Sequence, residues 1–258
     1  MGIRTTLLSV LGEDKYLALL AGSFQRIYRT GWLGVDYQDV YFLKEIVREG
    51  DYCVDIGAHL GYYTLELSRL VKGAGKVVAV EPMPKFNATL RRLLQRKKAT
   101  NVELYQVAMG GEGEYVEMGV PKVGNAKKFA YARVKESAAN FEYAESAKVK
   151  NEKGNDLFRL LPRLDFIKCD VEGLEVQVFS SMMEVVQKHL PLLLCELGGK
   201  QDRIILFEML QPLGYSVYRL EKGKLHPLDV YSDVDTVSHN HYLIPTRHVE
   251  RLKTLIVS

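Results

Sequence analysis

Residues 51–64 read DYCVDIGAHLGYYT, and this stretch decides how the rest of the chain is interpreted. Tyr52–Ile56 has the apolar character of a buried strand, and the following Tyr62–Val71 shows helical spacing of leucines. Gly57 and Gly61 lie between the two elements. Glycines at such a turn let the backbone approach a ligand closely, at the place where open α/β sheets bind theirs. The stretch therefore predicts a ligand-binding turn between a strand and a helix.

The alternation of strand and helix continues along the chain and predicts a doubly wound α/β fold, mainly parallel, with helices on both faces. The further strands are expected at Lys76–Val80, Val102–Val107, Leu164–Cys169, Leu192–Cys195 and Tyr215–Leu220, and the further helices at Lys85–Lys98, Leu174–Lys188 and Gln201–Leu210.

Two segments interrupt this rhythm. Residues 1–50 are expected to form an N-terminal helical extension, and residues 51–258 one Rossmann-like domain. Within that domain, residues 110–160 are rich in Gly, Lys, Glu and Ala. We interpret them as an insertion at the carboxyl edge of the sheet, where loops commonly shape a substrate site.

The composition narrows the classes of protein to which the chain can belong. Its 47% hydrophobic and 26% charged residues are typical of globular proteins, and a net charge of +3 predicts no nucleic-acid partner. No apolar run is long enough to span a membrane, and charged residues near the N-terminus disfavour a signal peptide. Three cysteines without CxxC spacing are expected to be buried free thiols in the cytoplasm. The number of subunits stays open, including a homo-oligomer.

Two acids stand beside the predicted turn. Asp55 opens it, and a carboxylate there suits a cationic or amino-bearing cofactor better than a pyrophosphate. Position 62 is Tyr, so the third glycine of a dinucleotide fingerprint is absent, which counts against a nicotinamide-dependent oxidoreductase. Glu81 ends the second predicted strand, where an acid can accept both hydroxyls of a ribose. Its alternative role is to cap the helix that follows.

A third concentration of charge lies at residues 165–175, which read DFIKCDVEGLE. Lys168 falls in an otherwise apolar strand, so an inward side chain is expected to pair with a carboxylate. Asp170 and Glu172 fall at the carboxyl end of the sheet, beside the predicted crevice. For Glu175, a solvent-facing acid in the first helical turn is as good an explanation as a functional one.

The motifs follow one another as DIGAHLGYYT at 55–64, VEP at 80–82, NV at 101–102, VAMG at 107–110 and IKCDVEGLE at 167–175. Together they resemble the FkbM family of S-adenosylmethionine-dependent methyltransferases, over roughly residues 35–245. One departure is His59, where the family commonly has Asn. An imidazole there would have a charge that depends on pH.

The resemblance implies a class I methyltransferase fold, a seven-stranded sheet whose last strand, near His241–Ile244, is antiparallel and pairs with Tyr215–Leu220. It also implies S-adenosylmethionine as cofactor, with Glu81 at the ribose and Gln106–Ala108 near the adenine. The cofactor-binding residues expected from it are Asp55, Gly57, Ala58, His59, Gly61, Tyr62, Glu81, Pro82, Ala108 and Asp170.

The acceptor implied by the resemblance is a hydroxyl group on a sugar or another secondary metabolite. An alcohol is a poor nucleophile until its proton leaves, so a nearby base is expected. The candidates are Asp170 and Glu172, with His241 and His239 behind them. A metal held by Asp170, Glu172, Glu196 and a histidine is the less favoured arrangement, and we expect none. A non-catalytic, methyltransferase-like binding module is the main alternative to an enzyme.

Overall fold

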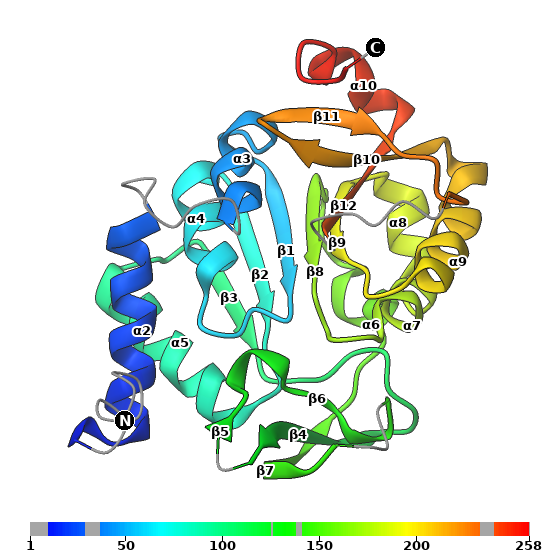
Figure 1. Ribbon diagram of the computed structural model, residues 1–258. Helices are drawn as coiled ribbons and strands as arrows, with labels where there is room; N and C mark the ends of the chain where they lie inside the picture. Colours follow the sequence, from blue (N-terminus) through cyan, green and yellow to red (C-terminus); the bar gives the residue numbers. More distant parts are fainter. Residues whose placement is uncertain (1–9, 29–36, 125, 138–140, 233–239, 258) are drawn as a thin grey trace.

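The computed structural model describes residues 10–28, 37–124, 126–137, 141–232 and 240–257 and shows a mixed α/β fold (Figure 1). The helices are α2 (Glu13–Ile27), α3 (Gln38–Ile46), α4 (Tyr62–Val71), α5 (Pro84–Lys97), α6 (Gly154–Phe158), α7 (Glu175–Ser180), α8 (Met183–His189), α9 (Lys200–Leu210) and α10 (Thr246–Leu252). The main-sheet strands are β1 (Tyr52–Ile56), β2 (Lys76–Val80), β3 (Val102–Tyr105), β8 (Phe166–Cys169), β9 (Leu192–Glu196), β10 (Tyr215–Glu221), β11 (Lys224–Pro227) and β12 (Asn240–Pro245).

The main sheet has the strand order β11-β10-β12-β9-β8-β1-β2-β3. Strands β3, β2, β1, β8 and β9 are mutually parallel, and β12 runs antiparallel between β9 and β10. This confirms the class I arrangement, including the antiparallel last strand that pairs with β10. The sheet described here has eight strands, one more than the seven implied by the resemblance.

The additional strand, β11, results from a tight hairpin. Glu221 pairs with Lys224, so only Lys222 and Gly223 connect β10 to β11, and both have positive φ, 48° and 77°. Such a two-residue connection with two left-handed residues matches the twist of an antiparallel pair. The strand itself reads KLHP, which is too short and too polar for the sequence pattern to reveal it.

Helices cover both faces of the sheet, and the strands bury side chains toward each. On one face Cys53 and Phe166 pack with residues of α3 and α4. On the other face Ile167 and Leu193 pack with residues of α7, α8 and α9. Asp55 and Lys168 are register partners on β1 and β8 and point to the first face. Among the described residues, no helix is both long and apolar enough to cross a membrane.

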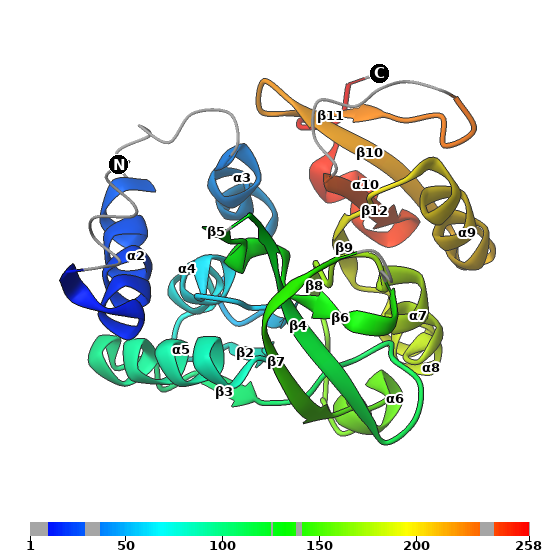
Figure 2. The same cartoon turned by 60° about the horizontal axis from the view of Figure 1, so that its bottom comes forward.

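A second, antiparallel sheet lies at the carboxyl edge of the first (Figure 2). It consists of β4 (Tyr115–Val123), β5 (Ala126–Lys127), β6 (Arg133–Val134) and β7 (Tyr143–Lys150), and we call it the insertion sheet. Ala108 forms a bridge with Asn151, so the chain leaves the main sheet and returns to it at one place.

Four charged side chains connect the insertion sheet to two helices. Lys85 at the start of α5 lies 2.7 Å from Glu13 of α2 and 2.9 Å from Glu145 of β7. Lys127 of β5 lies 3.0 Å from Glu13 and also pairs with Glu145. The four groups thus form a closed ring, called here the four-charge ring, which joins the N-terminal helix, the core and the insertion sheet.

Candidate functional site

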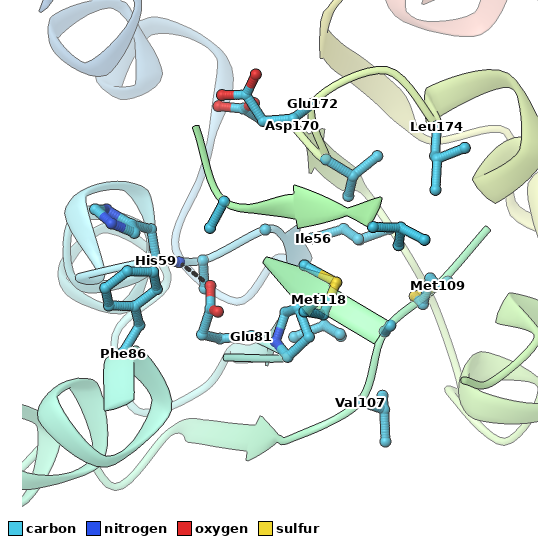
Figure 3. Close-up of a pocket in the computed structure, with 18 of the residues that line it drawn as sticks. Ile56, His59, Glu81, Phe86, Val107, Met109, Met118, Asp170, Glu172 and Leu174 are labelled. Atoms are coloured by element: carbon cyan, nitrogen blue, oxygen red, sulfur yellow. Dashed lines mark hydrogen bonds between the residues drawn. The ribbon is translucent and has the colours of Figure 1, made fainter. Parts of the chain in front are cut away.

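A cavity lies at the carboxyl ends of β1, β2 and β8, beneath the insertion sheet (Figure 3). Its empty space is about 960 Å³, including the part that is open to solvent. The motif residues that line it are Gly57, Ala58, His59, Tyr62, Glu81, Pro82, Ala108, Asp170 and Glu172.

The turn after β1 requires glycine at position 57. Gly57 has φ of 82°, and a Cβ added to it would lie 1.8 Å from the carbonyl oxygen of Asp170. The close approach follows from the pairing of β1 with β8, since the Asp170 amide donates to the Ile56 carbonyl at 3.0 Å. A side chain at position 57 would therefore push apart the two loops that form the floor of the cavity.

Gly61 serves the packing of α4 on α5. It caps α4 with φ of 83°, and an added Cβ would lie 2.4 Å from a methyl carbon of Leu90. Gly61 does not line the cavity, and neither does Asp55, which is buried and accepts a hydrogen bond from the Thr64 hydroxyl. Burial raises the pKa of Asp55 to about 6. The structure thus places these two predicted cofactor residues behind the cavity wall.

Glu81 holds the turn in place from the end of β2. One carboxylate oxygen accepts the His59 amide at 2.7 Å, and the other accepts the Met83 amide at 2.8 Å at the start of α5. The carboxylate is buried and faces the cavity. Burial raises its pKa to about 7, with further contributions from the charges of Asp55 and Asp170, against the two amide hydrogen bonds. Glu81 therefore fixes the backbone that leads into α5 and contributes a carboxylate to the cavity, while the N-cap residue Met83 makes no side-chain capping hydrogen bond.

His59 adopts a left-handed conformation with φ of 48°. Its ring packs edge-on against Phe86, with ring centroids 4.5 Å apart. Burial lowers the imidazole pKa to about 4, against the charge of Asp170 and a hydrogen bond to the Phe129 backbone. The imidazole is consequently neutral near pH 7, so the expected pH-dependent charge falls outside the physiological range.

Lys168 pairs with a carboxylate, as its position in an apolar strand predicted. Its ammonium nitrogen lies 3.2 Å from an oxygen of Asp170, and only 1% of the residue is exposed. Burial acts to lower the Lys168 pKa, but Asp170, Tyr63 and Glu196 together raise it above its ordinary value. The ammonium is therefore a permanent buried charge beside Asp170.

Glu172 faces the insertion sheet. It forms an ion pair of 2.9 Å with Arg133 of β6, and its carboxylate lies near that of Asp170 at one side of the cavity. Burial and the charge of Asp170 raise the Glu172 pKa to about 8, even though Arg133 lowers it. Through this ion pair the loop that follows β8 contacts the insertion sheet.

Glu175 anchors the same loop from below. It is buried and accepts the amides of Val171 at 2.9 Å and Gly173 at 3.1 Å. A solvent-facing position, one of two interpretations of the sequence, is therefore wrong. Glu175 fixes the backbone between Asp170 and Glu172, which gives a structural reason for a glutamate at the end of the IKCDVEGLE motif.

His241, one of the predicted bases, does not line the cavity. His241 is buried on β12, opposite Cys195 and on the sheet face covered by α7, α8 and α9. We therefore no longer consider it as a base. His239 lies outside the described residues. Among the described residues, no group of three or more His, Cys, Asp or Glu side chains is arranged to hold a metal ion.

The roof of the cavity is the part that sequence reasoning missed. It consists of apolar side chains of the insertion sheet and the short helix η3 (Phe129–Tyr131). These residues are Met118, Phe129, Ala130, Ala132 and Val134. They occur singly in a segment without a chemical motif, so only the alternation within β4 and β6 carried any signal for them.

The comparisons with known proteins address the family and the fold. The family model described as "Methyltransferase FkbM domain" matches residues 55–219, which is more than half of the chain. No curated protein sequence matches significantly.

Three solved structures resemble the chain at low identity. A methyltransferase FkbM from Methylobacillus flagellatus is 19% identical over 79% of this chain and 50% of that one, with a TM-score of 0.48. A SAM-dependent O-methyltransferase from Thermotoga maritima is 16% identical over 81% and 64%, with a TM-score of 0.43. An rRNA methylase from Streptococcus thermophilus is 11% identical over 80% and 92%, with a TM-score of 0.43. With the family match spanning the glycine turn, Glu81 and the motif at residues 167–175, the chain belongs to the FkbM family of S-adenosylmethionine-dependent methyltransferases.

Proposed function

We propose that the protein transfers a methyl group to a hydroxyl oxygen of a small polar acceptor, a sugar or another secondary metabolite. The observation that supports this best is a surplus of carboxylates at the carboxyl edge of the sheet. Two cations, Lys168 and Arg133, are set against them. The carboxylates are Asp55, Glu81, Asp170, Glu172 and Glu196.

The surplus fits the cofactor. S-adenosylmethionine carries a sulfonium and an ammonium against one carboxylate, so it brings net positive charge to the place where carboxylates are crowded. Burial and mutual repulsion raise the pKa of Glu81 and Glu196 to about 7, which shows how poorly their charges are compensated in the free protein. A cationic ligand would relieve that repulsion, whereas a pyrophosphate would add to it.

Individual residues have distinct roles in this proposal. Glu81 accepts the ribose hydroxyls, because each carboxylate oxygen keeps a lone pair beyond the amide that it already accepts. Gly57 lets the Asp170 backbone pass close to the turn, which sets the spacing of the two loops under the ligand. Ala108 and Met109 offer an apolar edge for the adenine, opposite Leu174.

The bound cofactor supplies a methyl group that is already activated by its sulfonium. The protein then has to align the acceptor and remove its proton. Asp170 lines the cavity and is the carboxylate that we assign to the proton, with Glu172 beside it. Asp170 would take the proton of the acceptor hydroxyl when that oxygen attacks the activated methyl group.

The apolar roof supports a small acceptor. Met118, Phe129 and Val134 are buried and close the cavity on the side of the insertion sheet. Space for the acceptor is thereby confined to the region around Asp170 and Glu172. We also infer a cytoplasmic location, since the three cysteines are buried free thiols, as is usual in a reducing compartment.

The experiment has two steps. Calorimetry with S-adenosylhomocysteine tests the cofactor site, and incubation of the protein with methyl-labelled cofactor and a panel of sugars and polyketide alcohols tests transfer to oxygen. We expect micromolar binding and label in an ether linkage. Binding without transfer to any hydroxyl would favour the non-catalytic module, for which His59 in place of the usual Asn is the one specific indication.

A further inference from the structure

Three titratable side chains meet at the carboxyl ends of β8 and β9. Lys168 lies 3.2 Å from Asp170, and Glu196 is the last residue of β9, whose pairing with β8 sets it beside Asp170. The two strands are parallel neighbours with Cys169 opposite Cys195, which brings the residues that follow them together. Of the three side chains, only Asp170 lines the cavity.

We propose that Lys168 and Glu196 are positioning residues for Asp170, and that the three side chains form one unit that takes up a single proton from the acceptor. The inference rests on the proposed function, because it assumes that Asp170 faces the acceptor hydroxyl. It assigns a role to Glu196, which no cofactor motif includes, and to the lysine of the IKCDVEGLE motif.

The position of Lys168 is fixed from several sides. Its ammonium nitrogen also lies 3.4 Å from the Cys169 carbonyl oxygen and 5.1 Å from the centre of the Tyr63 ring. Asp55 is its register partner on β1. A buried ammonium is costly unless carboxylates and hydrogen-bond acceptors surround it, so its partners hold it in one place. From there its charge lies directly against the Asp170 carboxylate.

Glu196 adds a second carboxylate to the same unit. Two carboxylates in contact resist being ionised together, and a proton between them joins them by a hydrogen bond. Burial and the charge of Asp170 together raise the Glu196 pKa to about 7, although Lys168 acts to lower it. The unit therefore changes its charge near neutral pH, where a general base works best.

Other charged groups face this unit from each neighbouring element. Glu175 on α7 acts to raise the Glu196 pKa. Lys168 acts to lower the pKa of Asp39 on α3. The Asp39 carboxylate accepts hydrogen bonds from Tyr242 and Asn240 of β12. The remaining groups are Asp55 on β1, Tyr63 on α4, Glu81 after β2, and Glu172 with Arg133. Lys168 is the fully buried cation among them.

In the reaction, the acceptor proton moves to the Asp170 carboxylate and is then shared with Glu196. The shared proton later passes to water, which restores the ionised unit. No oxidant or further reactant is needed. Lys168 lowers the Glu196 pKa and the charge of Asp170 raises it, so the unit should keep its proton to higher pH when Lys168 is removed.

The test measures charge at the reacting end without an acceptor. Sinefungin carries a primary amine where the cofactor carries its sulfonium methyl, whereas S-adenosylhomocysteine has no charge there. The ratio of their dissociation constants, measured by calorimetry from pH 5 to pH 9, reports the ionisation of the unit. Glu81 contacts the part that both ligands share, so its titration cancels in the ratio.

In the unaltered protein we expect sinefungin to bind about tenfold more tightly above pH 7, with the preference lost below it. Asp170→Asn should abolish the preference at every pH. Glu196→Gln should move its midpoint down by about one pH unit or more, and Lys168→Met should move it up. Glu184 on α8 is exposed, so Glu184→Gln serves as the control and should leave the midpoint unchanged.

Three results would overturn the inference. One is an unchanged midpoint in Glu196→Gln, and a second is a midpoint that moves with Glu172→Gln instead. The third is an equal shift of the midpoint in Lys168→Met and in Lys168→Arg, although the arginine keeps the charge. If Lys168→Met does not fold, Glu196→Gln and Lys168→Arg still decide the matter. Failure to bind either ligand would refute the proposed cofactor site, which is a different outcome from a preference that does not titrate.

Discussion

The floor and the roof of the cavity are built in different ways. The floor comes from short contiguous motifs at the ends of β1, β2 and β8, where Gly57, Glu81 and Asp170 each have a defined polar or steric task. The roof comes from single apolar residues of the insertion sheet, such as Met118 and Val134. The floor is fixed by backbone geometry, which tolerates few residue types, whereas the roof only requires side chains of suitable size.

This difference separates the two halves of the function. A floor of fixed geometry suits a ligand that never changes, and a roof of exchangeable side chains suits an acceptor that differs between relatives. If this is right, substitutions in the floor should abolish cofactor binding, and substitutions at the contact with the roof should change it little.

Gly57→Ala should have the largest effect. The new methyl group would meet the Asp170 carbonyl at 1.8 Å in a left-handed backbone conformation. We expect the free energy of unfolding to fall by about 2 kcal/mol or more and cofactor affinity to fall by about 100-fold. Chemical denaturation and calorimetry measure the two. Gly73→Ala, where a Cβ meets nothing within 4 Å, is the control and should change neither.

Glu81→Ala removes the acceptor of two backbone amides and of the ribose hydroxyls. Two hydrogen bonds to a charged group predict a loss of about 100-fold in affinity for S-adenosylhomocysteine, with less effect on folding than in Gly57→Ala. Glu208→Ala, an exposed glutamate on α9, should bind normally. Undiminished affinity in Glu81→Ala would mean that the ribose lies elsewhere.

Acid should weaken cofactor binding through the same carboxyl. The ionised form accepts the ribose hydroxyls, and the Glu81 pKa of the free protein is about 7. Affinity should therefore fall below pH 7, by at most about tenfold per pH unit. The stability of the free protein should change in the opposite direction, since between pH 4.5 and 7 the folded chain holds a proton that the unfolded chain releases. Calorimetry and thermal unfolding across this range test both signs.

Arg133→Met should have the smallest effect. It breaks the ion pair with Glu172, whose side chain is 20% exposed, so we expect a loss of about 1 kcal/mol in stability and less than threefold in cofactor affinity. Hydrogen exchange should become faster in the loop around Glu172. Lys135→Met breaks another ion pair of the insertion, with Glu117, and should leave that loop unchanged. A large loss of cofactor affinity in Arg133→Met would remove the distinction between floor and roof.

The sequence predicted most of the floor because its constraints are local. A strand followed by glycines, an acid after the next strand, and a lysine in an apolar strand all leave marks at fixed spacing, and Lys168 pairs as expected. It grouped Glu196 with Asp170 only as possible metal ligands, since the pairing of β8 with β9 that sets both beside Lys168 is not a local feature. His241 was misjudged for the same reason, because the register of β12 decides which face it occupies.

The four-charge ring has a consequence for protein engineering. Glu13 of α2 and Glu145 of the insertion sheet share the same two lysines, so a roof borrowed from a relative would arrive without its matching anchor on α2. Glu13 and Lys85 would then face water or a group of like charge. A chimaera that is meant to accept a new alcohol should therefore exchange α2 and residues 110–150 together, as one transplantable unit.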